Sequence, residues 1–131
     1  MADPFTLPIA IMRADIDELG HVNNIVYLRW AQEIAIAHWR AKASADMLAN
    51  YIWVVRRHEV DYRAPLQLGD EAEVRTRVDA EPQGAQWRRF VDIWKRDAAA
   101  PCAQIVSNWV LLDAATRRVK RVPPEIVARF G

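Results

Sequence analysis

Cysteine and glycine are both scarce in this chain of 131 residues, which contains one cysteine and four glycines. A single thiol, Cys102, excludes an internal disulfide and a zinc site built from several cysteines. It follows Pro101 in an expected loop with no motif around it, and we interpret it as an incidental thiol. A chain that needs no disulfide is most easily accommodated in a reducing compartment, so we expect a cytoplasmic location.

Long apolar runs and an excess of charge of either sign are also missing. No segment approaches the roughly 20 apolar residues of a membrane helix, so no membrane partner is expected. The start of the chain, 1–5, lacks the basic and apolar regions of a signal peptide. The 18 basic and 17 acidic side chains leave a formal net charge of +1. This balance and the absence of a recognised binding motif argue against a nucleic-acid partner.

The hydrophobic pattern predicts one strand, one long helix and four further strands. The segment 5–13 is apolar and partly β-branched, which favours a first strand. From Ile25 to about Ser44, apolar residues near helical spacing and several alanines predict a well-buried helix. The later strands are expected at 51–63, 71–79, 86–96 and 103–113, with 118–122 extending the sheet and a short terminal helix opening at 123–125.

Segregated elements of this kind predict an α+β fold, with a single domain spanning residues 1–131. We expect one antiparallel sheet of about five or six strands wrapped around a long central helix. The four strands after the helix are expected to form a meander. The uncovered face and edges of such a sheet need a partner, so we expect a homo-oligomer.

A dense polar segment lies between the first predicted strand and the helix. It runs from Asp15 to Tyr27 as DIDELGHVNNIVY, and Asn23 or Asn24 is a suitable N-cap for the helix. The backbone amides that open a helix lack intrahelical partners, and with the helix dipole they attract developing negative charge. A carboxylate next to them can act as a nucleophile or as a general base for water. The segment is therefore the candidate active site.

This segment resembles the motif Asp-x-Asp-x-x-Gly-His-Val-Asn-Asn-x-x-Tyr of the hot-dog thioesterases related to 4-hydroxybenzoyl-CoA thioesterase and the long-chain acyl-CoA thioesterases. The predicted element order agrees with that family over essentially the whole chain. The later segment 59–65, followed by 68–70, resembles the family's second strand and turn. The resemblance implies a hot-dog fold and hydrolysis of an acyl-CoA thioester to a free acid and CoA. It also implies no cofactor, no metal, and a homodimer or homotetramer with active sites at subunit contacts.

The resemblance also implies roles for individual residues. Asp17 is the expected catalytic carboxylate, and the Asn24 N–H, with a neighbour such as that of Ile25, is the expected oxyanion donor. His21 is expected either to act with Asp17 or the substrate, or to be a hydrogen-bonded structural residue. The expected substrate-binding residues are Gly20, Val22, Asn23 and Tyr27, together with Arg88 and Arg89, whose guanidinium groups suit the phosphates of CoA.

Several residues in and near the motif have competing interpretations. Asp15 is expected to form a turn or cap, and Asn23 is also suited to a capping role. Tyr27 is as suitable for core packing as for lining an acyl pocket. Glu33 is either an alternative catalytic carboxylate on the helix or the i,i+4 partner of Arg29. His38 and His58 show no metal-ligand spacing, and we interpret both as structural.

Three other functions compete with acyl-CoA hydrolysis. They are a non-catalytic acyl-CoA-binding module, a hydrolase of acyl-carrier-protein thioesters, and a hot-dog dehydratase or hydratase. Asp17 argues against a pure binding module, and its spacing from His21 with the paired asparagines fits the thioesterase branch better than the hydratases. The chain has no Gly-x-Ser-x-Gly elbow and no glycine-rich phosphate loop.

Overall fold

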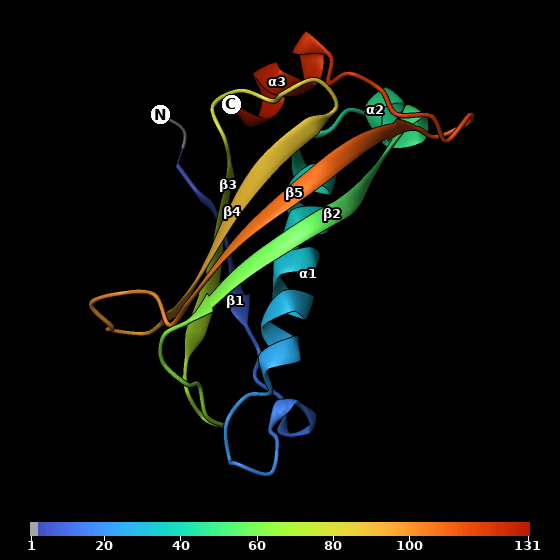
Figure 1. Ribbon diagram of the computed structural model, residues 1–131. Helices are drawn as coiled ribbons and strands as arrows, with labels where there is room; N and C mark the ends of the chain where they lie inside the picture. The colour runs from blue at the N-terminus through green and yellow to red at the C-terminus, as the bar shows by residue number, and fades with distance from the viewer. Residues whose placement is uncertain (1–2) are drawn as a thin grey trace.

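The computed structural model describes residues 3–131, which form one antiparallel sheet curved around a long helix (Figure 1). The strands are β1 (Phe5–Ile9), β2 (Tyr51–Tyr62), β3 (Ala72–Val78), β4 (Gln86–Lys95) and β5 (Ala103–Asp113). The helices are α1 (Asn24–Lys42), α2 (Ala45–Asn50) and α3 (Pro124–Phe130), and the short 3-10 turn η1 spans Arg13–Asp15. This architecture confirms the predicted α+β class and the sheet wrapped around one central helix.

The strand order in the sheet is β1-β3-β4-β5-β2. Strands β3, β4 and β5 form a meander, but β2 pairs with β5 at the opposite edge from β1. The expected four-strand meander is therefore wrong for β2. A physical reason lies in the strand lengths: the 11 residues of β5 match the 12 of β2, whereas β3 has only seven.

Strand β2 carries a β-bulge at Arg56, between Val55, which pairs with Trp109, and Arg57, which pairs with Asn108. The extra residue shifts the alternation of side chains along the strand. The less exposed positions are consequently odd-numbered before the bulge, up to Val55, and even-numbered after it, at His58 and Val60. Both halves of β2 therefore present apolar side chains towards α1.

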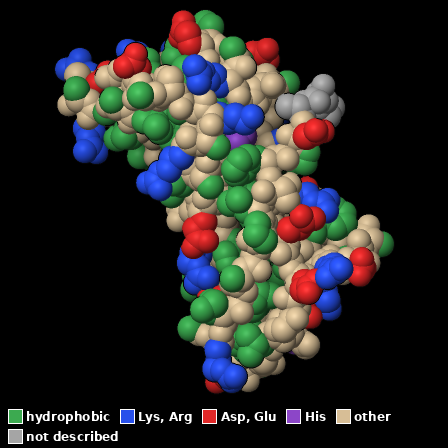
Figure 2. All heavy atoms as spheres, turned by 180° about the vertical axis from the view of Figure 1, so that it is seen from behind, with side chains coloured by type: hydrophobic (Ala, Val, Ile, Leu, Met, Phe, Trp, Pro, Cys, Tyr) green, Lys and Arg blue, Asp and Glu red, His purple; other side chains and the backbone are tan. Residues whose placement is uncertain are grey.

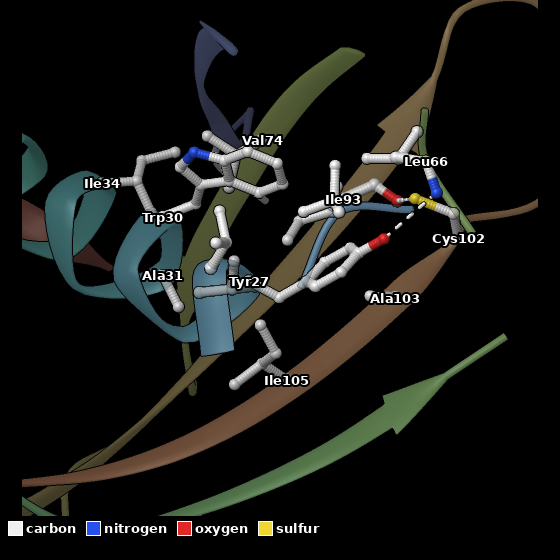
Figure 3. Packing of buried hydrophobic residues seen from close by; sticks show 13 residues of the cluster. Tyr27, Trp30, Ala31, Ile34, Leu66, Val74, Ile93, Cys102, Ala103 and Ile105 are labelled. Carbon is white, nitrogen blue, oxygen red and sulfur yellow. Dashed lines mark hydrogen bonds between the residues drawn. The ribbon is translucent and has the colours of Figure 1, made fainter. Parts of the chain in front are cut away.

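The main core lies between α1 and the concave face of the sheet. Figure 3 shows Trp30 and Ile34 of α1 in the same cluster as Val74, Ile93 and Ile105, which come from three neighbouring strands. Alternation along β3 follows the sequence pattern, with Val74 and Thr76 buried. Ile25, expected in the apolar stripe, is instead 74% exposed, because the buried face of α1 starts with Val26 and Tyr27.

A second hydrophobic cluster lies at the C-terminal end of α1. It contains Met47 of α2, Trp87, Leu111, and Ile126 and Phe130 of α3. The expected continuation of the long helix to Ser44 does not form, since α1 ends at Lys42 and Ser44 caps α2 by accepting a hydrogen bond from the Met47 N–H at 3.2 Å. The predicted terminal helix is confirmed as α3, whereas 118–122 contributes only an isolated bridge between Val119 and Leu112.

The outer surface carries charges of both signs. Figure 2, the face opposite to that of Figure 1, shows acidic, basic and hydrophobic side chains intermixed, with no large area of one sign. Among residues 3–131, no helix combines the length and apolar character that spanning a membrane requires.

Candidate active site

The segment between β1 and α1 folds into a tight loop that is closed by a bridge between Ile16 and Val22. The Asp17 N–H donates to the carbonyl of His21 at 2.9 Å, and the Gly20 N–H donates to the carbonyl of Asp17 at 3.0 Å. Gly20 has φ +83°, a left-handed conformation in which a side chain would be strained. The sequence therefore brings Asp17 and His21 together at the base of this loop.

The carboxylate of Asp17 is half-buried and held by one of its two oxygens. Oδ1 accepts a hydrogen bond from the Leu19 N–H at 2.9 Å, which forms an Asx turn. Within the described residues, Oδ2 accepts no hydrogen bond and Asp17 has no ion-pair partner. One oxygen thus fixes the side chain, and the other is left for a substrate or a water molecule.

The first turn of α1 leaves one backbone amide available. Asn23 is the N-cap: its Oδ1 accepts from the Ile25 N–H at 3.0 Å, and its carbonyl accepts from the Val26 N–H at 2.9 Å. No hydrogen bond found in residues 3–131 uses the Asn24 N–H. The cap therefore occupies Ile25, the second expected donor, and leaves Asn24 at the positive end of the helix dipole.

Asp15 is only 3% exposed, and its contacts fix the position of the loop. Its carboxylate accepts from the Met12 N–H at 2.9 Å and pairs with Arg29 Nη1 at 3.0 Å, while its carbonyl accepts from the Asn23 N–H at 2.8 Å. Burial acts to raise the pKa of this carboxyl, but the bonds from Arg29 and Met12 outweigh burial and hold the pKa below its ordinary value. Asp15 thus has the structural role expected from the sequence.

A cleft of about 380 Å³ opens at this end of α1. It is bounded by the loop, the first turn of the helix and the end of β2 with the segment that follows it. Of the residues expected from the sequence, Gly20 shapes the loop but does not line the cleft. Those that do line it are Asp17, His21, Val22, Asn23, Asn24 and Tyr27.

Tyr27 belongs both to the cleft and to the core. It is 2% exposed, and its Oη accepts a hydrogen bond from the Leu66 N–H at 3.3 Å (Figure 3). Burial is the main cause that raises the pKa of Tyr27 to about 12, so the phenol is neutral at physiological pH. Tyr27 therefore packs in the core and also lines the cleft.

Sequence reasoning missed two cleft residues at the end of β2. Tyr62 donates through its hydroxyl to the carbonyl of Asn24 at 3.0 Å, and its ring packs edge-on against that of Tyr27. Arg63 lines the cleft and donates from Nε to Gln104 at 2.8 Å. The segment 59–65, which resembles the family's second strand, was the available signal, but it gave no indication of which side chains reach the helix.

The structure does not bring Arg88 and Arg89 to this cleft. They are consecutive on β4, so their side chains point to opposite faces of the sheet. Arg88 is exposed and pairs with Asp79 at 3.2 Å, whereas Arg89 is buried and lines another cavity. Glu33 is also absent from the cleft lining; it is exposed and pairs with Arg29 at 3.4 Å.

The two other histidines make structural contacts. His38 Nδ1 lies 2.9 Å from Arg89 Nη1, and His58 Nδ1 lies 2.7 Å from Ser107 Oγ. In the part of the chain that the structure describes, no group of three histidine, cysteine or acidic side chains is placed to hold a metal ion.

A half-buried carboxylate and a free helix-opening amide thus line one cleft on a sheet-wrapped helix. Residues 13–130 match the thioesterase-like superfamily, and the chain belongs to this family. This membership confirms the predicted family resemblance and the predicted reaction class, thioester hydrolysis. Comparison with curated protein sequences finds no match.

Solved structures share this fold. A thioesterase from Thermus thermophilus, complexed with coenzyme A and zinc, is 26% identical with a TM-score of 0.81, covering 95% of this chain and 90% of that one. A 1,4-dihydroxy-2-naphthoyl-CoA thioesterase from Synechocystis is 16% identical with a TM-score of 0.81, covering 97% and 95%. A 12:0-ACP thioesterase from Umbellularia californica is 21% identical with a TM-score of 0.79, covering 96% of this chain and 52% of that one.

Proposed function

We propose that this protein hydrolyses an acyl-CoA thioester to a free carboxylic acid and CoA in the cleft at the start of α1. The observation that carries the proposal is the presence of a carboxylate with a free oxygen, on Asp17, and a free amide, on Asn24, in the walls of one cleft. The thioester carbonyl oxygen accepts the Asn24 N–H, and the helix dipole stabilises the charge that develops on it. Donors of this kind are typically worth about 10²–10³ in rate.

Asp17 supplies the electron pair or removes the proton. In one route Oδ2 attacks the thioester carbon, the C–S bond breaks, and water then hydrolyses the mixed anhydride. In the other route Oδ2 takes a proton from a water molecule, which attacks the same carbon directly. Each route consumes one water and releases the acid and the CoA thiolate, which takes up a proton. His21 lies beside Asp17 in the cleft and orients it or the substrate.

CoA is the carrier favoured by the known relatives. The Thermus thermophilus thioesterase is complexed with coenzyme A, and the Synechocystis enzyme is a CoA thioesterase. Arg63 provides a guanidinium group at the cleft, which suits a phosphate-bearing substrate. The Umbellularia enzyme acts on acyl carrier protein, so thioesters of that protein are the second substrate class to test.

We also propose that the enzyme is a homodimer, or a homotetramer of two such dimers, formed through β2. This strand of 12 residues is an edge of the sheet. Its outer edge pairs with no other strand within residues 3–131. Open edges of this length tend to pair with another strand. Antiparallel pairing of two β2 strands extends the sheet and places the Tyr51 end of one copy beside the Tyr62 end of the other. The cleft then lies at the subunit contact.

The test of the reaction is thiol release from a panel of acyl-CoAs by wild type, Asp17→Asn and Glu33→Gln. Asp17→Asn removes the charge but keeps an acceptor for the Leu19 N–H, so we expect an unchanged Tm and a fall in kcat of at least about 10²-fold. Glu33→Gln, the matched control, should keep its rate. Cys102 is buried and its thiol donates to the Ile93 carbonyl at 3.2 Å, so it should not react with the thiol reagent.

Two results would contradict this assignment. Full activity in Asp17→Asn together with a loss of activity in Glu33→Gln would show that the catalytic carboxylate is Glu33 on α1. Failure to cleave any CoA or acyl-carrier-protein thioester would remove the proposed substrate classes. A single turnover in H₂¹⁸O demonstrates the covalent route if ¹⁸O appears in Asp17, which requires water to attack the Asp17 carbonyl carbon of the anhydride; ¹⁸O in the product acid is compatible with either route.

A further inference from the structure

A second cavity, of about 330 Å³, lies near the other end of α1 from Asp17, where α2 and α3 meet the sheet (Figure 1). We call it the tryptophan cavity, because four of the six tryptophans line it: Trp39, Trp53, Trp87 and Trp109. It shares no lining residue with the cleft. At 1.5 Å per residue, about 12 Å of helix separates Tyr27 of the cleft from Ala35 of this cavity. Within one chain the two sites are therefore distinct, whereas in the proposed dimer the Tyr51 end of β2, which lines the cavity, lies beside the partner's cleft.

Arg89 is a buried cation in the wall of this cavity, and it is only 8% exposed. Its Nη1 donates to His38 Nδ1 at 2.9 Å and to Thr76 Oγ1 at 3.0 Å. Burial, then Arg89 and Lys42, lower the pKa of His38 to about 4, so both acceptors are neutral at pH 7. They fix the position of the guanidinium without supplying a negative charge.

The charge of Arg89 is therefore uncompensated. Within residues 3–131, Arg89 forms no ion pair, and its Nε and Nη2 donate no hydrogen bond. Burial lowers the pKa of Arg89 to about 10, which still leaves it charged at neutral pH. Proteins rarely bury an arginine without an acid, because desolvation of the cation is costly unless an anion offsets it.

Trp109 lines the cavity beside Arg89. Its indole Nε1 is buried and, in the described part of the chain, has no hydrogen-bond partner. Arg89 pairs with Ser107 across the sheet, and Trp109 is two residues further along β5, so both side chains lie on the same face. The cavity is lined by a second arginine, Arg40, and by no acidic residue. The Trp109 N–H has no surface exposed to the cavity, so Arg89 is the one buried donor group that we assign to a ligand there.

We propose that the tryptophan cavity binds a free carboxylic acid with an aromatic or aliphatic body, whose carboxylate accepts hydrogen bonds from Arg89. A carboxylate offers acceptors only, which matches donors that lack acceptors, and its charge offsets that of the guanidinium. The apolar body packs against the indole rings, and the volume falls within the range of small-molecule sites. The site does not depend on hydrolysis at Asp17.

The test compares acids with amides of the same shape on the full chain. Benzoate, phenylacetate and octanoate are titrated against benzamide, phenylacetamide and octanamide, by calorimetry and by intrinsic tryptophan fluorescence. Four tryptophans line this cavity, but Trp30 packs edge-on against Tyr27 of the cleft, so the variants and not the fluorescence signal alone assign the site. We expect at least one acid to bind with a Kd at least about tenfold below that of its amide, since hydrogen bonds to charged groups are the stronger ones.

Variants locate the binding. Arg89→Met should abolish the preference for acid over amide. Trp109→Phe removes an N–H that is not exposed to the cavity, so it should keep the preference. Trp53→Phe is the matched control that removes a cavity indole and leaves Arg89, and Asp17→Asn is the control for the cleft. Both controls should keep the preference.

Several outcomes would overturn the proposal. They are equal binding of acids and amides, no binding of either because a second copy or packing fills the cavity, and an undiminished preference in Arg89→Met. If Arg89→Met does not fold, the comparison of acids with amides on wild type and Asp17→Asn decides: equal Kd values for acid and amide refute the site. Loss of the preference in Asp17→Asn would place the acid in the cleft and refute it equally.

Discussion

Arg29 pairs with two carboxylates in different environments, and this allows a prediction with its own control. Asp15 lies 3.0 Å from Arg29 Nη1 and is 3% exposed, whereas Glu33 lies 3.4 Å from Arg29 Nε with its side chain 61% exposed. Replacing either acid by its amide removes one negative charge from a partner of Arg29. The difference in stability between Asp15→Asn and Glu33→Gln therefore measures the combined effect of burial and of the additional Met12 hydrogen bond.

The expected magnitudes follow from these contacts. The Asp15 carboxylate satisfies both Arg29 and the Met12 N–H, and an amide, which has one acceptor oxygen, cannot satisfy both. Hydrogen bonds to charged groups contribute about 1.5–3 kcal/mol, and the half-exposed Arg29 can regain water, so we expect a loss of about 2 kcal/mol. For 131 residues this corresponds to a fall in Tm of roughly 7 °C. Loss of the exposed Arg29–Glu33 ion pair in Glu33→Gln should lower the free energy of unfolding by at most about 0.5 kcal/mol.

Thermal and urea unfolding followed by circular dichroism, at one protein concentration, measures both variants. The folded-state pKa of Asp15 is lowered, so its contribution is present above the unfolded value of about 3.9 and is lost as the pH falls through the folded pKa. The gap between wild type and Asp15→Asn should therefore be full near pH 7 and shrink below about pH 4. Equal losses for the two variants, or a gap that widens in acid, would refute the reasoning.

Two further predictions concern His38 and the subunit contact. With its pKa lowered to about 4 by burial, His38 binds its proton less readily in the folded than in the unfolded state, so wild type should lose stability relative to His38→Gln as the pH falls from about 6.5 to 4. Imidazole NMR signals of His38 that titrate near pH 6.5 would contradict this. Sedimentation equilibrium should give at least twice the chain mass of 15.1 kDa. A fully active monomer at assay concentrations would exclude the proposed dimer.

Local patterns predicted most of the elements and the loop before α1. The strand at 103–113 has the predicted bounds, and the polar segment from Asp15 to Tyr27 supplies seven of the eleven residues that line the cleft. These features depend on residues close together in the chain, such as the Asn23 cap and the turn at Gly20. The Asn24 amide was predictable as a donor, but the capture of the Ile25 amide by Asn23 required the actual side-chain conformation.

Long-range pairing was the part that the sequence could not show. The placement of β2 beside β5 depends on contacts between residues about 40 to 60 positions apart, and alternation alone is compatible with other orders. The approach of Tyr62 to Asn24 follows from that pairing and was missed for the same reason. Consecutive residues of a strand point to opposite faces, so Arg88 and Arg89 could not both contact one ligand. This error in the predicted site could therefore have been found from the sequence.

The bulge at Arg56 determines which changes of length β2 can accept. If side chains alternated regularly through Arg56, Tyr62 would share a face with Val54 instead of Val55, and its hydroxyl would turn away from the helix. Deletion of Arg56 would instead leave a regular strand whose two ends still face the same interior. A residue inserted into the regular part of the strand would rotate one end relative to the other, unless a second bulge absorbed it. Natural variation in the length of this strand should therefore concentrate at Arg56, which lies outside the cleft lining.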